Sequence, residues 1–310
     1  QGLPAAGFFP STYTMLKQSL WSLAASALFS LMAAFVKLCA GHFGTFELVF
    51  YRSFFGVLSI GFFVFSHHYT LRTQYFWGHV KRSGLGTLSI LVWFFTLGLM
   101  PLSTNVTLTY TTPLFMAANF ILLALLRHRA IPWTLCLAIV GGFAGVVITL
   151  QPSFASDALM PSLLCLSIGF IDLVIYWQIK ELGDMKEPSW RIVFYFTLFG
   201  TVAGLIGTLL TGGLHSISWE SGAYLLGIAV TATLAQLCTT RAYASGNMLL
   251  SSCLGFSAIP FSALFSWLFF GDDITWVMTL GMALIIAAGC VATVNVKRQE
   301  TRHTDTAPKT

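Results

Sequence analysis

Charge is scarce in this sequence. Lys, Arg, Asp and Glu make up 9% of its 310 residues, against roughly a quarter of an ordinary soluble domain. With 16 basic and 11 acidic side chains, the chain cannot cover the surface of a water-soluble globule of this length. Hydrophobic residues account for 56%, which excludes a disordered chain. The composition therefore predicts a polytopic membrane protein.

Motifs for metal, nucleotide and nucleic-acid chemistry are also missing. The seven histidines are dispersed without an HExxH pattern, and no Walker sequence is present, so we expect no metal, no other cofactor and no ATP-driven step. The Asp272-Asp273 pair suits a helix N-cap better than a metal site. Basic residues stand singly between apolar runs, which argues against a nucleic-acid partner.

The cysteines lack the spacing of a disulfide framework or a redox motif. Five of the six lie singly inside apolar stretches: Cys136, Cys165, Cys238, Cys253 and Cys290. We expect them to be small core residues.

The sequence contains ten apolar stretches, each long enough to cross a bilayer as a helix of about 20 residues. It lacks the alternation of apolar and polar residues that is typical of a membrane β-barrel, so the predicted fold class is all-α. The predicted spans are 17–38, 45–66, 83–99, 102–126, 132–150, 159–180, 189–211, 219–241, 244–270 and 274–296.

The basic residues are distributed asymmetrically between the two faces of this arrangement. Fourteen of the 16 Lys and Arg, including Lys81 and Arg82 before the span 83–99, fall on the face that holds both termini. Only Lys37 and Arg52 fall toward the other face. By the positive-inside rule we expect both termini in the cytoplasm and a multi-pass protein of the inner, cytoplasmic membrane.

An internal repeat divides the chain into two similar parts. The run Glu47–Gly56 aligns with Arg191–Gly200 at an offset of 144, with Val, Phe, Tyr, Phe and Gly recurring in order. We expect a cytoplasmic segment 1–16, five-helix repeats 17–152 and 153–296, and a cytoplasmic tail 297–310. Because five is odd, the second repeat enters the membrane from the opposite side. This inverted topology is typical of alternating-access transporters.

The chain resembles the ten-helix EamA-type branch of the drug/metabolite transporter superfamily across residues 17–296. The two-by-five layout carries the resemblance, together with Phe46–Arg52, Pro113-Leu-Phe and Phe269–Asp273. The resemblance implies export or uptake of small metabolites through a central cavity.

Asp172 is a carboxylate deep within the predicted span 159–180. A charge at this depth is costly, so the side chain should face a cavity or a partner. It shares a helix face with Tyr176. Asp172 could carry a proton, bind a cationic group of a solute, or fix packing through hydroxyl groups of a neighbouring helix.

Arg52 lies about two turns inside the span 45–66. It could bind a substrate carboxylate with its planar guanidinium, or join Glu47 and Lys37 in a structural cluster at the membrane interface. If Arg52 and Asp172 faced one cavity, they would suit a zwitterion such as an amino acid.

Polar stripes and a proline recur in the fourth and ninth spans. Pro113 is expected to bend the fourth span, and Pro260 lies beside the stripe of the ninth. Such stripes either line a solute path or form bonds between helices. The candidates on these stripes are Asn105, Thr109, Thr112, Asn247 and Ser251. Gln236 of the eighth span is a further candidate for a contact with the solute, and the aromatic residues Trp93 and Tyr110 are candidates for the cavity wall.

These features predict a secondary active transporter for an amino acid or a related amphipathic or zwitterionic metabolite, coupled to protons. The alternative solute is a nucleobase- or nucleoside-type metabolite such as S-adenosylmethionine. An intramembrane enzyme or a passive channel is disfavoured. The expected partners are a small solute, the lipid bilayer and protons, and the expected state is a monomer or weak homodimer.

Overall fold

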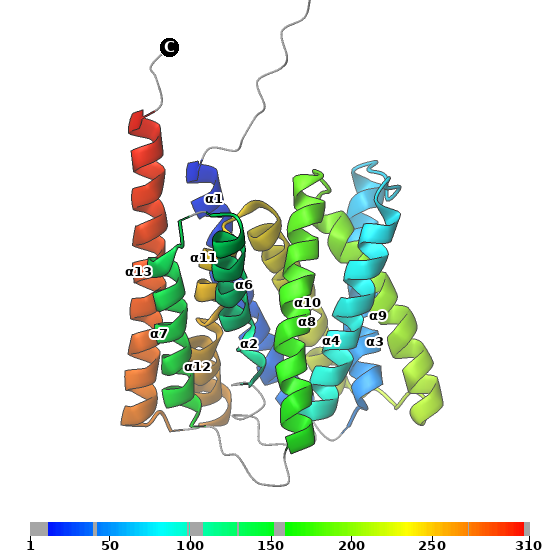
Figure 1. The fold of residues 1–310 in the computed structure, drawn as a ribbon. Helices are drawn as coiled ribbons and strands as arrows, with labels where there is room; N and C mark the ends of the chain where they lie inside the picture. The colour runs from blue at the N-terminus through cyan, green and yellow to red at the C-terminus, as the bar shows by residue number, and fades with distance from the viewer. Residues whose placement is uncertain are drawn as a thin grey trace, which may run out of the picture.

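The computed structural model describes residues 12–39, 42–97, 99, 108–128, 130–151, 159–271 and 273–306. These residues fold into a helical bundle (Figure 1). The helices are α1 (Thr12–Ser19), α2 (Trp21–Cys39), α3 (Thr45–Ser66), α4 (Phe76–Leu97), α6 (Thr112–Leu126), α7 (Trp133–Leu150), α8 (Leu159–Asp184), α9 (Ser189–Thr211), α10 (Trp219–Ser245), α11 (Met248–Gly255), α12 (Ala258–Phe270) and α13 (Trp276–Thr306).

Seven helical segments in the described part of the chain are long and apolar enough to cross a membrane. They are Met15–Val36, Thr45–Ser66, Leu159–Asp184, Ser189–Thr211, Trp219–Ser245, Met248–Phe270 and Trp276–Asn295. Each corresponds to one predicted span. The other three predicted spans correspond to the shorter apolar helices α6 and α7 and to α4, whose first turns carry His79, Lys81 and Arg82. This is the pattern of a polytopic membrane protein.

The outward surface of the bundle is apolar. Phe62 and Phe65 of α3 are 74% and 79% exposed, and Leu210 of α9 is 81% exposed. Such large exposed side chains recur on most of the helices. In water so much exposed apolar surface would be unfavourable, whereas lipid tails solvate it. The outer face therefore matches the lipid-exposed surface expected of membrane helices.

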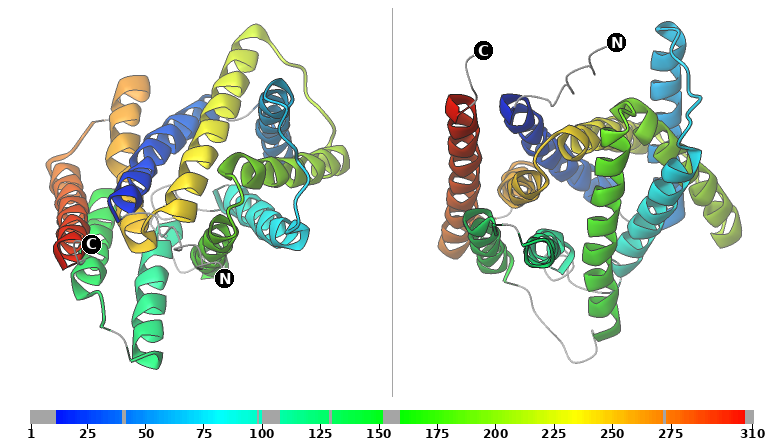
Figure 2. Two further views of the ribbon diagram at one scale, coloured as in Figure 1. Left: turned by 90° about the horizontal axis from the view of Figure 1, so that it is seen from above. Right: turned by 45° about the horizontal axis from the view of Figure 1, so that its top comes forward.

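Helices pack in pairs that are distant in the sequence. α2 packs along α10, α3 along α9, α4 along α8, and α7 along α13. Figure 2 shows the α7–α13 pair and the α3–α9 pair at opposite sides of the bundle. The start of α1 and the end of α13 lie at the same end of the bundle (Figure 1), which is called the terminal end below.

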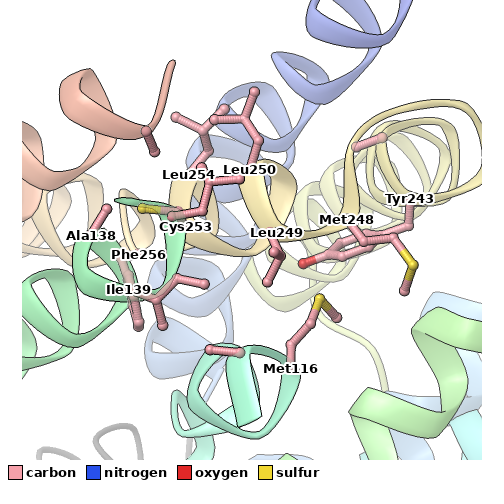
Figure 3. Close-up of a cluster of buried hydrophobic side chains, with 14 of the residues drawn as sticks. Met116, Ala138, Ile139, Tyr243, Met248, Leu249, Leu250, Cys253, Leu254 and Phe256 are labelled. Carbon is pink, nitrogen blue, oxygen red and sulfur yellow. The ribbon is translucent and has the colours of Figure 1, made fainter. Parts of the chain in front are cut away.

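A cluster of buried apolar side chains joins α6, α7, α10 and α11 (Figure 3). Met116, Ile139 and Leu250 are fully buried within it. Five of the six cysteines are buried, among them Cys136 and Cys253 of this cluster. Cys290 is exposed, so the expectation that it is a core residue is wrong.

Glycines allow two of these helix pairs to come into backbone contact. A Cβ atom on Gly204 of α9 would lie 2.7 Å from the backbone nitrogen of Phe50 in α3. A Cβ atom on Gly145 of α7 would lie 2.7 Å from the carbonyl oxygen of Gly281 in α13. Small residues at such crossings let helices approach closely in lipid.

The fourth predicted span is interrupted before its proline. Leu108 and Thr109 are helical, Tyr110 and Thr111 form a turn, and α6 begins at Thr112. Pro113 therefore occupies the first turn of a helix, where its missing N–H is not needed and its fixed φ is favourable. The predicted bend within a continuous helix is wrong at this position.

The ninth predicted span is likewise two helices. α11 ends at Gly255 and α12 begins at Ala258, with Phe256 and Ser257 between them. The N–H groups of these two residues donate to the carbonyl oxygens of Cys253 and Leu254 at 3.3 and 3.0 Å. Pro260 lies in the first turn of α12, as Pro113 does in α6. Both breaks border one cavity that lies between the helices.

Candidate functional site

A cavity of about 300 Å³ lies between the helices. Residues of α2, α3, α4, α8, α9, α10, α11 and α12 line it, together with the start of α6 and the residues just before it. Nine of the eleven residues selected from the sequence are among the lining residues: Arg52, Trp93, Thr109, Tyr110, Thr112, Asp172, Tyr176, Gln236 and Ser251. Arg52 and Asp172 thus face one cavity.

Asp172 lies near the middle of α8, and its carboxylate has a hydroxyl partner. Ser89 of α4 donates a hydrogen bond of 2.7 Å to Oδ1 of Asp172. No Lys, Arg or His nitrogen of the described residues lies within ion-pair distance of this carboxylate. A carboxylate held by one hydroxyl keeps free acceptor capacity for a solute or a proton.

Two stacked tyrosines stand beside Asp172. Tyr176, one turn further along α8, stacks on Tyr243 of α10 with ring centroids 3.9 Å apart and planes inclined by 4°. The Tyr243 hydroxyl forms a 3.2 Å hydrogen bond with the Ser252 hydroxyl. Tyr243 was not selected from the sequence because it lies between the predicted spans 219–241 and 244–270, close to Arg241.

Two arginines line the cavity. Arg52 of α3 is 5% exposed and forms no ion pair or side-chain hydrogen bond with any residue that the structure describes. Arg82 of α4 is 2% exposed, and its Cζ atom lies 4.0 Å from the ring centroid of Phe196. The expectation that Arg82 lies in a loop at the membrane surface is wrong. Helical phase turns Arg82 inward, whereas its neighbour Lys81 faces outward.

Several polar residues of the cavity bond partly to the protein itself. Gln236 Oε1 accepts a long 3.5 Å hydrogen bond from Nη2 of Arg82. Thr112 Oγ1 donates to the carbonyl of Thr109 at 3.2 Å, and Ser251 Oγ donates to the carbonyl of Ala242 at 3.2 Å. These hydroxyls keep acceptor capacity for a solute.

Asn247 is not among the residues that line the cavity. Asn247 caps α11, because its Oδ1 accepts a 3.0 Å hydrogen bond from the N–H of Leu250. This contact gives Asn247 a structural role. Asn105 lies outside the described residues. Asn119 of α6 accepts a 3.1 Å hydrogen bond from Nε1 of Trp177 in α8 and so connects two helices.

A polar cluster lies at the terminal end of the bundle. Glu187, between α8 and α9, accepts hydrogen bonds from Thr73 at 2.7 Å and from Arg191 at 3.0 Å. Arg191 also donates to the carbonyl oxygen of Thr70 at 2.9 Å. Nε2 of His79 lies 3.3 Å from Oε2 of Glu187. The cluster ties the loop between α3 and α4 to the start of α9.

A second polar contact lies at the opposite end of the bundle. Glu47, at the start of α3, is 2% exposed. Its carboxylate accepts a 2.8 Å bond from the backbone N–H of His215 and lies 2.7 Å from Nδ1 of the same residue. His215 follows α9, so this contact ties the loop between α9 and α10 to the start of α3.

Glu187 should make stability depend on pH in the acidic range. Burial favours the neutral acid, but the hydrogen bonds from Thr73 and Arg191 and the charge of Arg191 outweigh it and lower the pKa below its ordinary value of 4.5. A lowered folded-state pKa contributes stability above 4.5 that is lost as the pH falls through the folded value. We expect Glu187→Gln to cost about 1–3 kcal/mol at neutral pH and to flatten this acid dependence.

The measurement is the thermal unfolding midpoint of purified protein in detergent between neutral and acidic pH. Glu181→Gln is the matched control, because Glu181 is an exposed carboxylate on α8. If both variants showed the wild-type acid profile, the contacts of Glu187 would contribute nothing to stability.

Comparisons with known proteins identify transporters as relatives. The chain is 28% identical over 233 residues to a riboflavin transporter of Rhizobium johnstonii, covering 74% of each chain. It is 24% identical to the pseudopaline exporter CntI of Pseudomonas aeruginosa, covering 88% of this chain and 94% of the relative. An S-adenosylmethionine uptake transporter of Rickettsia felis is 28% identical over 162 residues, about half of each chain.

A solved structure shares the fold. It superposes with a TM-score of 0.79 at 16% identity over 91% of this chain and 99% of the other. No family model matches the sequence. The fold, the cavity and the relatives together support a multi-pass membrane protein with a general role in small-metabolite transport. The relatives fit a family of the drug/metabolite transporter type.

Proposed function

We propose that the protein is a secondary transporter of the EamA type that moves a small metabolite by alternating access and couples this movement to protons. The observation that carries the proposal is the cavity, because one carboxylate, two arginines and several aromatic and hydroxyl side chains converge there from both predicted repeats. Asp172 is the proposed proton carrier, and the protein is a carrier without enzymatic activity.

The pattern of helix packing supports two inverted repeats, 17–152 and 153–296. In this assignment α2 corresponds to α8, α3 to α9, α4 to α10, α6 to α11 together with α12, and α7 to α13. Exchanging the repeats converts the α2–α10 pair into the α8–α4 pair and converts α12–α2 into α6–α8, all of which are in contact. The α3–α9 and α7–α13 pairs map onto themselves. A pseudo-two-fold arrangement of this kind is what inverted repeats produce.

Individual contacts between α3 and α9 also follow the sequence offset of 144. A Cβ atom on Gly56 would meet Thr197, and a Cβ atom on Gly200 would meet Ser53. The offset exchanges these two contacts. It also relates Glu47 to Arg191, and each of these residues tethers the loop that follows the partner helix, through His215 and Thr70 respectively.

The positions of the cavity and of these tethers suit alternating access. The cavity lies between the Glu187 cluster at the terminal end and the Glu47–His215 contact at the other end. Release of one contact while the other holds would expose the cavity to one side at a time. We place both termini in the cytoplasm and the protein in the inner membrane, as the distribution of Lys and Arg predicts.

The solute is proposed to be a small amphipathic metabolite of the amino-acid type, with Arg52 facing its carboxylate. A nucleobase- or nucleoside-type solute is the second candidate, because one relative is an S-adenosylmethionine uptake transporter. The flat walls provided by Trp93, Tyr110 and the Tyr176–Tyr243 stack suit either class.

Counterflow in proteoliposomes tests the proposed function. Vesicles loaded with unlabelled riboflavin, S-adenosylmethionine or an amino-acid mixture receive the same solute in labelled form outside. A carrier accumulates label transiently and shows saturation, a channel does not, and an enzyme converts the solute. Absence of exchange for every solute, or exchange without saturation, would contradict the proposal.

A further inference from the structure

Charge within the cavity is unbalanced. Arg52 and Arg82 contribute two permanent positive charges, whereas Asp172 contributes at most one negative charge. The sum of the described charged groups that line the cavity is therefore positive whether Asp172 is ionised or protonated. Arginine stays charged in proteins, so a change in its own protonation does not remove the imbalance.

Arg82 is buried without a full set of partners. Its Nε and Nη1 atoms have no hydrogen-bond acceptor, and Nη2 has only the 3.5 Å contact with Gln236. The face of the Phe196 ring stabilises the cation but accepts no conventional hydrogen bond from the edge of the guanidinium. The donors at Nε and Nη1 are unsatisfied but almost fully covered by protein atoms, so an acceptor reaches them only when the Arg82 side chain moves.

Arg52 also lacks a hydrogen-bond partner among the described residues, but its guanidinium nitrogens are not fully covered and are open to the cavity. The residue as a whole is 5% exposed. Buried polar groups in native structures nearly always have partners, and a buried charge without one is costly. Two such groups on α3 and α4 that face one cavity indicate a ligand that supplies acceptors.

We propose that the solute is an organic anion whose carboxylate or phosphate oxygens bind Arg82 and Arg52. This inference rests on the proposed transport function, and it favours an anion over the zwitterionic and neutral solutes considered there. An oxyanion supplies the planar, charged acceptors that guanidinium groups bind most strongly. The apolar remainder of the solute packs against Trp93 and Tyr110, which line the same cavity.

The same charge count separates an anion from a zwitterion. With Asp172 ionised the three side chains sum to one positive charge, and with Asp172 protonated they sum to two. A solute with one or two negative charges neutralises the cavity in these states, whereas a zwitterion or a neutral solute leaves it charged in both. Binding of a proton at Asp172 therefore favours binding of the anion.

The test compares matched solutes that differ in charge. Thermal unfolding of the purified full-length protein in detergent is measured with nicotinate against nicotinamide, benzoate against benzamide, and riboflavin 5′-phosphate against riboflavin. Ionic strength is kept equal. A ligand that binds the folded state raises the unfolding midpoint. We expect the anion of at least one pair to raise it and the neutral partner to leave it unchanged.

Variants at the two arginines locate the site. Arg82→Gln and Arg52→Gln should each weaken binding of the stabilising anion at least about tenfold, as expected for lost hydrogen bonds to a charged group. Arg82→Lys should retain part of the affinity because it keeps the charge. Arg241→Gln is the matched control, because Arg241 is exposed, bonds to Gln18 and does not line the cavity.

Stabilisation by a neutral partner as large as that by its anion would overturn the inference, as would the absence of stabilisation by every anion. Wild-type affinity in both glutamine variants would overturn it as well. Counterflow separates this failure from failure of the transport function. Saturable anion binding without exchange would retain the anion site and reject transport, whereas exchange of neutral solutes alone would retain transport and reject the anion site.

Discussion

Asp172→Asn is expected to abolish transport driven by a proton gradient. The amide has nearly the same shape as the carboxylate and can still accept the hydrogen bond of Ser89 through its oxygen, but it cannot take up a proton. Flux under an imposed pH gradient should fall to the level of protein-free vesicles. Counterflow, which needs no net proton movement, should persist. The measurement is labelled-solute uptake into proteoliposomes.

Asp184→Asn controls for the loss of a carboxylate from the same helix. Asp184 lies at the exposed end of α8, where it pairs with Lys180 at 2.8 Å. This variant should transport at the wild-type rate, because an exposed ion pair contributes little. Gradient-driven flux that is equal in Asp172→Asn and the wild type would remove Asp172 from the coupling mechanism.

Gly204→Ala is expected to destabilise the bundle strongly for so small a change. The added methyl group would lie 2.7 Å from the nitrogen and 2.8 Å from the Cα atom of Phe50, so the backbone of α3 would have to move. Overpacking of this kind costs about 1–3 kcal/mol. The unfolding midpoint in detergent and the yield of monodisperse protein should both fall.

Gly61→Ala is the matched control on the partner helix. A Cβ atom at Gly61 of α3 would meet nothing within 4 Å. Alanine is the better helix former by about 0.5–1 kcal/mol, so this variant should be as stable as the wild type or slightly more stable. If the two variants changed the midpoint by equal amounts, close contact between α3 and α9 would not determine stability.

Helix positions were predictable wherever hydropathy alone decides them. The predicted spans 45–66 and 189–211 coincide with α3 (Thr45–Ser66) and α9 (Ser189–Thr211). Polar turns bound both spans, and most of the residues inside them are apolar. The predicted span 83–99 began too late, because α4 continues through Lys81 and His79 to Phe76. Hydropathy marks the apolar part of a helix and not the helix itself.

The assignment of Arg82 failed for a related reason. A basic residue at the end of an apolar run is usually found at the membrane surface, and Lys81 follows that rule. One residue along a helix turns the side chain by about 100°, which is enough to direct Arg82 into the bundle. Which of two adjacent basic residues faces inward depends on the neighbouring helices, and a single sequence does not contain this information.

The two prolines show another limit of sequence patterns. Hydropathy predicts that Pro113 and Pro260 lie within continuous spans, whereas each lies in the first turn of a new helix. A proline within an apolar run fits a kink and a helix start equally well. Asn247 illustrates the same ambiguity for polar stripes, since it shares the stripe with Ser251 but caps the helix that begins after it.

The burial of nearly all the thiol groups makes this protein suited to site-directed chemical probing. Only Cys290 of the six cysteines is exposed, so Cys290→Ser would leave a background that reacts slowly with maleimides. Single cysteines could then be introduced into the connections at either end of the bundle, with the natural thiols retained. Labelling of such variants from inside or outside sealed vesicles would report the orientation of the chain directly.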